Sequence, residues 1–171
     1  MPISMASASL PIFHTMLGNL SHLLDKGLAH AEARKFDPAV LASYRLAPDM
    51  LPFTRQIQIA CDSVKNGVAR LSGLEAPKFE DNEQTFEELK ARIAKTLAWL
   101  DSVPASKLDG TEEKDITFPV GRETTRTMKG EAYLKHWVLP NMFFHVNMAY
   151  AILRHNGVEL GKADYLAGAT R

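Results

Sequence analysis

The sequence predicts an all-α protein, an up-and-down four-helix bundle with a small β-hairpin between its third and fourth helices. Four long stretches carry apolar residues at steps of three and four, as in helices that each bury one face. Between the third and fourth stretches this period stops, and short runs rich in Thr, Ile and Val take its place. The chain has 171 residues, 46% of them hydrophobic and 23% charged. We therefore expect a single domain over residues 1–171.

The first stretch predicts a helix that starts between Met5 and Ser9 and runs to about Lys35. Its apolar face consists of Leu10, Phe13, Leu17, Leu20, Leu24 and Leu28. Three histidines also lie along this helix: His14, His22 and His30. Steps of eight residues turn the side-chain direction by about 80° each time, so these histidines cannot converge on one ion. We interpret them as surface or boundary residues.

Two further helices are predicted next. Asp37, followed by a proline, predicts a short helix that ends at about Ser43. Asp49 is the next candidate N-cap, and the helix that it opens is expected to run to about Leu71. Gln56 lies beside the apolar stripe of this longer helix, where an amide side chain needs a hydrogen-bond partner.

The third long helix is expected to start after Asp81, which forms a capping-box pattern with Gln84, and to end near Pro104. Its charged residues indicate a solvated face: Glu87, Glu88, Arg92 and Lys95. Trp99 lies about 120° from the centre of the apolar stripe, so we expect it to cover a neighbouring loop or to meet a second subunit. We assign no catalytic site to this helix.

The interruption after the third helix predicts a small antiparallel sheet. Two short β-prone runs, 115–120 and 123–128, flank Gly121 and Arg122 and together indicate a β-hairpin. Pro119 lacks a backbone N–H, so the first run is expected to lie at a sheet edge.

The last long helix is expected to run from about Lys129 to Gly157. Pro140 removes one backbone hydrogen bond, so we expect a kink just before the next residue. His145 lies within the apolar stripe, and Asn141 lies one turn earlier, about 40° away. An imidazole and an amide on an otherwise apolar face need partners, which either the core or a ligand can supply.

Composition excludes several classes of protein. Lys+Arg and Asp+Glu number 20 each, and no basic cluster is present, so we expect neither nucleic acid nor an anionic membrane as a partner. No apolar run reaches the roughly 18 residues that span a bilayer, and the N-terminus does not resemble a signal peptide. The single Cys61 excludes an internal disulfide and a multi-thiolate zinc site. We expect a cytoplasmic protein.

Two segments resemble a known family. RLAPDMLPFTRQIQ (45–58) and FHVNMAYAILRHNGVELGK (144–162) resemble an uncharacterised family, a domain of unknown function, within the DinB/YfiT-like metalloenzyme superfamily. The likeness covers nearly the whole chain and implies a DinB-like four-helix bundle. Metal-binding relatives hold a divalent ion with three histidines. The resemblance places His145 at one of these positions, and Gln56 and Asn141 at the other two.

Two classes of function follow. In the first, the bundle has kept a mostly apolar pocket without the metal and binds a small molecule through Gln56, Asn141 and His145, with Ile57 and Met142 as walls. Formation of a homodimer through one helix face is an equally plausible role for such a bundle. The alternative is a divalent-metal-dependent enzyme of the thiol transferase or isomerase type. Its zinc or nickel ion would be held by His145 with weak help from the two amides.

Three further interpretations stay open at this point. His145 can be a core histidine with a hydrogen-bonded ring, and Gln56 can be a boundary residue bonded to backbone or to Asn141. Cys61 and His145 can also be paired as nucleophile and base, which requires that the fold bring them together. No catalytic residue is assigned from the sequence.

Overall fold

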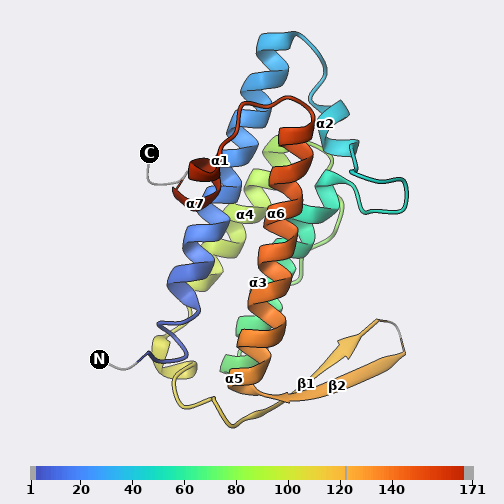
Figure 1. Ribbon diagram of the computed structural model, residues 1–171. Helices are drawn as coiled ribbons and strands as arrows, with labels where there is room; N and C mark the ends of the chain where they lie inside the picture. Colours follow the sequence, from blue (N-terminus) through green and yellow to red (C-terminus); the bar gives the residue numbers. More distant parts are fainter. Residues whose placement is uncertain (1–2, 122, 168–171) are drawn as a thin grey trace.

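The computed structural model describes residues 3–121 and 123–167, and most of them are helical. Four long helices lie side by side in Figure 1: α1 (Leu10–Arg34), α3 (Phe53–Ser72), α4 (Phe86–Asp101) and α6 (Leu139–His155). Helix α3 packs against α6 and α4, and α1 packs against the same two helices from the other side. Their inward side chains form one continuous apolar core. The predicted combination of a mostly helical fold with a small antiparallel sheet is confirmed.

The chain between α1 and α3 differs from the prediction at one helix start. Helix α2 (Ala39–Ser43) follows Asp37, whose Oδ1 accepts the first N–H of the helix at 2.9 Å. Helix α3 begins at Phe53 rather than after Asp49, so the predicted N-cap is wrong. The reason is that residues 46–50 form bends and turns, and the Phe53 N–H donates to the Tyr44 carbonyl at 2.8 Å.

Helix α4 begins with a capping box, but other residues form it. Thr85 Oγ1 accepts the Glu88 N–H at 3.2 Å, and Glu88 Oε2 accepts the Thr85 N–H at 3.0 Å. Asp81, the predicted cap, instead forms ion pairs with Arg55 and Arg92. Arg92 corrects a second prediction, because its side chain is 1% exposed and does not belong to a solvated face.

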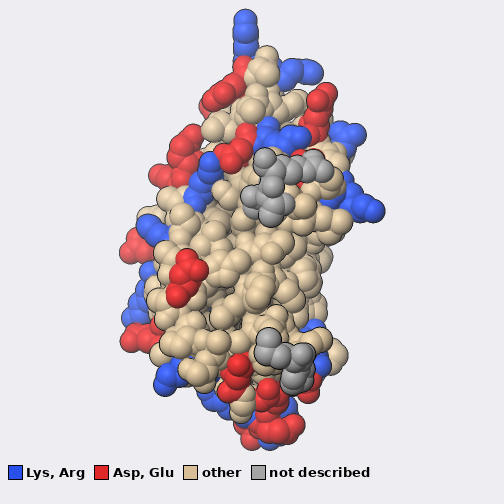
Figure 2. Space-filling view, turned by 90° about the vertical axis from the view of Figure 1, so that its left-hand side faces the viewer, with Lys and Arg blue, Asp and Glu red and all other residues tan. Residues whose placement is uncertain are grey.

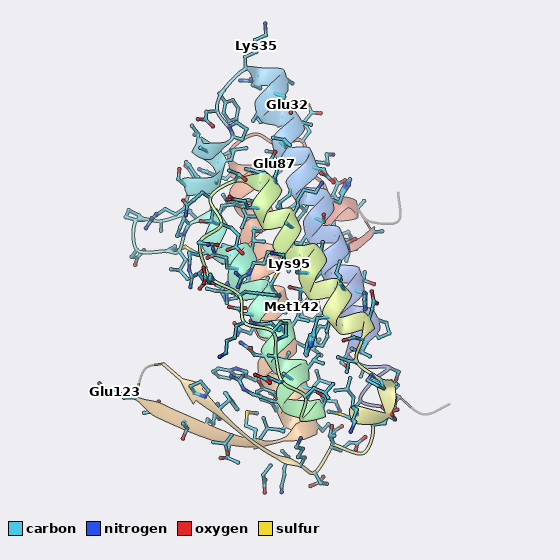
Figure 3. All side chains as sticks on the ribbon, turned by 180° about the vertical axis from the view of Figure 1, so that it is seen from behind. Glu32, Lys35, Glu87, Lys95, Glu123 and Met142 are labelled. Carbon is cyan, nitrogen blue, oxygen red and sulfur yellow. The ribbon has the colours of Figure 1, made fainter. Side chains whose placement is uncertain are left out.

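The remaining side chains of α4 lie as predicted. Figure 3 shows Glu87 and Lys95 along this helix, and both are exposed. Trp99 lies beside residues 75–78, so it covers the neighbouring connection. Met142, which is also labelled in Figure 3, lies inside the helical body and is fully buried.

The hairpin lies at one end of the molecule (Figure 1). A short 3-10 helix, η1 (Ala105–Lys107), leads from α4 toward β1 (Asp115–Val120), which pairs antiparallel with β2 (Thr124–Lys129). The predicted turn includes Gly121, whose φ of +71° lies in the left-handed region that glycine tolerates. Arg122, the other predicted turn residue, lies outside the described residues.

The last long helix of the prediction is built in three pieces. Helix α5 (Gly130–Tyr133) leads into a π-helical turn, η2 (Leu134–Val138), and then into α6. Pro140 lies in the first turn of α6, directly after this π-helical turn, and the kink expected just before Asn141 stays a prediction. Phe118 of β1 packs on this turn, with its ring centroid 4.9 Å from that of Trp137.

The C-terminal segment docks on α1 through α7 (Lys162–Ala167). His22 Nε2 lies 3.2 Å from Asp164 Oδ1, which joins the two helices. Of the apolar residues in this segment, Leu160 is buried, at 7% exposure, whereas Leu166 is exposed, at 55%. Residues 168–171 lie outside the described part of the chain.

One face of the molecule is poor in charge. Figure 2 shows few Lys, Arg, Asp or Glu side chains in its middle, and more of them toward the top and the bottom. The sequence explains this, because residues 1–24 and 137–153, which include most of α1 and α6, carry none of these four residue types. Within residues 3–121 and 123–167, no helix is both long and apolar enough to cross a membrane.

Candidate functional site

His145 of α6 and Gln56 of α3 form a buried hydrogen-bonded pair. His145 Nδ1 lies 2.8 Å from Gln56 Oε1, and Gln56 Nε2 donates to the Leu51 carbonyl at 2.9 Å. A carbonyl can only accept, so the bond to Leu51 fixes which end of the amide carries the N–H groups. Gln56 Oε1 must therefore accept a hydrogen bond from the Nδ1–H group of His145. The imidazole is held in the tautomer that has its proton on Nδ1 and a lone pair on Nε2.

Burial keeps this imidazole neutral. His145 is 8% exposed, and burial, with the nearby charge of Arg55, lowers its pKa from 6.5 to about 4. Among the fully buried side-chain nitrogen and oxygen atoms of the described residues, Arg92 Nε is the one without a hydrogen-bond partner. Nε2 of His145 has no hydrogen bond to a described residue either, so it is in contact with solvent. The site thus offers a neutral acceptor on a side chain that is 8% exposed.

The donor set around His145 does not fit zinc or nickel. No group of three His, Cys, Asp or Glu side chains within residues 3–121 and 123–167 could hold a metal ion. Gln56, which the resemblance predicts at a ligand position, uses its amide oxygen to accept a hydrogen bond from His145 itself. Neutral amide oxygens are weak ligands for zinc and nickel, which prefer nitrogen and sulfur. His145 is therefore the one imidazole in this pair.

Asn141 lies apart from this pair. The residue is half-buried, and no described residue forms a hydrogen bond with its side chain. It lines a hollow of about 210 Å³ with residues of α3, β1 and the π-helical turn. Of the three predicted ligand residues, the structure joins Gln56 to His145 and places Asn141 at this hollow. Ile57 and Met142, the predicted walls, are fully buried members of the core.

The hollow contains residues that the sequence analysis missed. Its lining includes Ile59, Asp62, Ser63, Asn66, Arg70, Pro119, Tyr133, Trp137, Val138 and Asn141. Arg70 Nη1 donates to the Tyr133 hydroxyl at 2.9 Å, which links α3 to α5. One signal was present, because steps of four, three and four residues place Ile59, Ser63, Asn66 and Arg70 on one side of α3. Tyr133, Trp137 and Asn141 likewise follow one another at steps of four, but the π-helical turn among them was not predicted.

A second buried polar cluster lies between α3 and α4. Arg92 forms ion pairs with Asp62 at 2.9 Å, with Asp81 at 3.0 Å and with Glu83 at 3.0 Å. Lys65 lies 3.2 Å from Asp62 and donates to the backbone of the connection before α4. Arg55 also pairs with Asp81, at 2.6 Å, so three cations face three carboxylates and we assign this cluster a structural role.

Cys61 belongs to the same side of α3 and is not a nucleophile. It is fully buried, and burial raises the pKa of its thiol from 9.0 to about 12. Its side-chain hydrogen bond is with Thr96 of α4 rather than with His145. A thiol with this pKa carries almost no thiolate at neutral pH, so the pairing of Cys61 with His145 as nucleophile and base is not supported.

The other histidines of α1 have separate partners. His14 Nε2 lies 3.3 Å from Asp101 Oδ1, and His22 contacts Asp164. His30 packs its ring against Phe36, with centroids 5.9 Å apart. They lie on the surface or at its boundary, as predicted, and they do not converge on one point.

Comparisons with known proteins identify a family and give no activity. Residues 5–166 match a family described as a domain of unknown function (DUF1993). The chain is 41% identical to a DinB family member protein from Shewanella denitrificans, whose crystal structure was determined at 1.83 Å resolution. That comparison covers 95% of this chain and 91% of the other, with a TM-score of 0.87. No curated protein matched the chain significantly.

Proposed function

The chain belongs to the DUF1993 family, and we propose that it is a DinB-like up-and-down four-helix bundle of one domain that binds a small molecule without a metal. The observation that carries this proposal is the hydrogen bond between Gln56 and His145. It uses Nδ1 of the remaining imidazole and the amide that stands at a missing ligand position. What is left for a ligand is the neutral Nε2, which is a hydrogen-bond acceptor.

His145 does not itself line the hollow, so the proposal requires one ligand to reach both the hollow and this acceptor. Asn141 and His145 are four residues apart on α6, so they lie on the same side of the helix, about 6 Å apart along its axis. The hollow of about 210 Å³ provides room next to Asn141. It is smaller than the roughly 300 to 1,000 Å³ that drug-sized ligands occupy, so we expect a compact molecule. A hydroxyl or N–H group on that molecule would donate to His145 Nε2.

A screen of compact polar molecules by ligand-observed NMR tests the proposal. We expect a ligand that binds the wild-type protein, binds Asn141→Ala and His145→Gln more weakly, and binds His14→Ala unchanged. His14 is a matched control because it lies on α1 and contacts Asp101. Equal binding to all four proteins would place the ligand elsewhere and contradict the proposed site.

One observation favours the alternative, a divalent-metal-dependent enzyme of the thiol transferase or isomerase type. Histidines that bind metals commonly donate their second ring N–H to an oxygen, as Nδ1 of His145 does to Gln56. Elemental analysis separates the two functions, using untagged protein challenged with zinc, nickel and manganese. About one ion per chain that is lost in His145→Ala but retained in His22→Ala would support the enzyme. We expect no bound ion in the wild-type protein.

A homodimer is compatible with this function. The exposed residues Thr15 of α1 and Asn147 of α6 lie in the charge-free stretches that cover one face of the molecule. Such a face can pack against its own copy without burying a charge. Light scattering is expected to give twice the mass of 19.0 kDa. Lys substitutions at both positions would then reduce the mass to that of one chain, and a monomeric wild-type protein would contradict the dimer.

A further inference from the structure

The hollow beside Asn141 contains a guanidinium group without a carboxylate partner. Arg70 is half-buried at the wall of the hollow, and none of the ion pairs in the described part of the chain includes it. Its side chain forms one hydrogen bond, from Nη1 to the Tyr133 hydroxyl at 2.9 Å. A guanidinium has five N–H donors in a planar fork, so four of them are left for other acceptors.

Tyr133 adds a second donor at the same place. Its hydroxyl oxygen accepts from Arg70, so the hydroxyl proton points to another acceptor, and no described residue provides one. Burial raises the pKa of Tyr133 above its usual 10, and the group therefore stays protonated at neutral pH. Arg70 and Tyr133 together present several donors from one wall. This arrangement suits an acceptor-only group such as a carboxylate.

The rest of the lining includes polar side chains and a tryptophan ring. The side chains of Ser63, Asn66 and Asn141 form no hydrogen bond with any residue that the structure describes. Trp137 also lines the hollow, and Phe118 contacts both its ring, at a centroid distance of 4.9 Å, and that of Tyr133, at 4.7 Å. A flat apolar group can stack on such a ring.

The acidic residue in the lining does not cancel the charge of Arg70. Asp62 turns its carboxylate toward α4, where Oδ1 lies 2.9 Å from Arg92 and 3.2 Å from Lys65. These two cations neutralise it. The uncompensated charge at the hollow is therefore that of Arg70, and it favours a ligand with one negative charge.

We propose that this hollow binds a compact planar carboxylate, which Arg70 and Tyr133 hold by its oxygens while its flat apolar part stacks on Trp137. The inference rests on the proposed function, because Asn141 belongs to both, and it names the class of ligand. The volume of about 210 Å³ suits a single ring rather than a nucleotide or a lipid. Four donors of Arg70 and the hydroxyl of Tyr133 can satisfy both oxygens of one carboxylate.

Benzoate and its neutral analogue benzamide test the charge requirement. The two probes have nearly the same shape and differ in the negative charge. Tryptophan fluorescence can follow binding in a Trp99→Phe protein, in which Trp137 is the remaining tryptophan. We expect saturable quenching by benzoate and an affinity for benzamide that is at least about tenfold lower.

Three variants locate the site. Arg70→Met and Tyr133→Phe are expected to weaken benzoate binding, the first by about tenfold or more and the second by less. Arg34→Met is the control, because Arg34 is exposed at the end of α1, next to Lys35, which Figure 3 shows at the opposite end of the molecule from the hairpin. Circular dichroism and thermal unfolding establish that each variant is folded. Tyr133→Phe keeps the ring, so it tests the hydroxyl even if the Arg70 variant unfolds.

The results separate this inference from the proposed function. Benzamide binding as tightly as benzoate would overturn the carboxylate assignment and leave the proposed small-molecule site in place. A second result would be that benzoate does not bind saturably while substitution of Asn141 or His145 still weakens binding of a ligand from the NMR screen. This result would likewise overturn the carboxylate assignment and leave the proposed small-molecule site in place. Loss of benzoate binding in Arg34→Met but not in Arg70→Met would place the anion elsewhere and overturn the inference.

Discussion

Polar side chains are equally buried on the two sides of α3. On one side their charges are neutralised by neighbours, and on the other side hydrogen-bonding groups and a charge are left without partners among the described residues. Arg92, which faces α3 from α4, and Gln56, which faces α6, are each 2% exposed. Around Arg92, three carboxylates neutralise the guanidinium, and Nε alone lacks a partner in the described part of the chain. On the other side, the pair formed with Gln56 ends at His145 Nε2, which no described residue uses, and Arg70 has no counter-charge.

This difference indicates which buried polar groups are candidates for binding a ligand. A cluster whose charges cancel inside the protein stabilises the fold and has little left to offer. A cluster with an acceptor or a cation still available at a surface hollow can bind something else. If candidate ligand-binding residues were chosen by burial and charge alone, Arg92 would be chosen. If they are chosen by hydrogen-bond donors and acceptors that remain available, His145 and Arg70 are chosen.

The largest expected effect is on the Arg92 side. Arg92→Met should leave Asp62, Asp81 and Glu83 facing one another without their shared cation. We expect the free energy of unfolding to fall by about 3 to 5 kcal/mol, measured by urea denaturation. Lys90→Met on the same helix is the control, because Lys90 forms an exposed pair with Asp25 and should cost at most about 1 kcal/mol. Similar losses in both variants would refute the structural role of the cluster.

The next effect concerns pH on the His145 side. The pKa of His145 is about 4 in the folded protein, compared with 6.5 for the free side chain. Above pH 6.5 both states are neutral. Between pH 6.5 and 4 the unfolded chain binds the proton first, so stability decreases as the pH falls, by roughly 3 kcal/mol at most. Below about pH 4 this contribution is fully lost.

Denaturation at pH 7 and pH 4.5 measures this effect, with His145→Gln as the comparison. The variant has no group that titrates at this position, so its stability should decrease less between the two pH values. A decrease equal to that of the wild-type protein would show that His145 is not neutralised by burial.

A smaller loss of stability is expected from Gln56→Met. The substitution preserves the volume but leaves the Nδ1 proton of His145 without its acceptor and the Leu51 carbonyl without its donor. Buried groups without partners typically cost about 1 to 3 kcal/mol. Thermal or urea unfolding provides the measurement. A change within about 0.5 kcal/mol would mean that water replaces the amide and that the pair is not held as we describe.

The smallest effect on stability is expected from Asn141→Ala. The side chain is half-buried and forms no hydrogen bond with a described residue, so its loss should change the free energy of unfolding by no more than about 0.5 kcal/mol. Benzoate titration of the same variant should nevertheless show weaker binding. A loss above about 1 kcal/mol would indicate that Asn141 supports the fold rather than the hollow.

Local patterns in the sequence predicted the helices and the hairpin, but they misplaced the buried charges. The apolar periodicity located the four long helices, because each must bury one face. Asp49 and Asp81 were plausible caps by type, yet tertiary contacts decide which candidate is used: Phe53 bonds to Tyr44, and Asp81 pairs with Arg92. Arg92 itself looked solvated because its three partners come from other segments of the chain.

The candidate site was predictable only in part. The position of His145 in an apolar stripe is a helical pattern, and its burial at 8% exposure agrees with it. Its bond to Gln56 links residues 89 positions apart, so periodicity could not identify it. The hollow depends on the π-helical turn before Pro140, which changes the side-chain directions of Tyr133 and Trp137 relative to a regular helix.

Nitrogen NMR of the His145 ring tests the central claim most directly. Long-range proton–nitrogen spectra at pH 7, recorded before and after one equivalent of zinc or nickel, report which ring nitrogen carries the proton and whether a metal binds. We expect a proton on Nδ1, an unprotonated Nε2 and no change with either metal. A proton on Nε2, or a shift of the Nε2 signal with one bound ion per chain, would contradict a metal-free site with Nε2 as the acceptor.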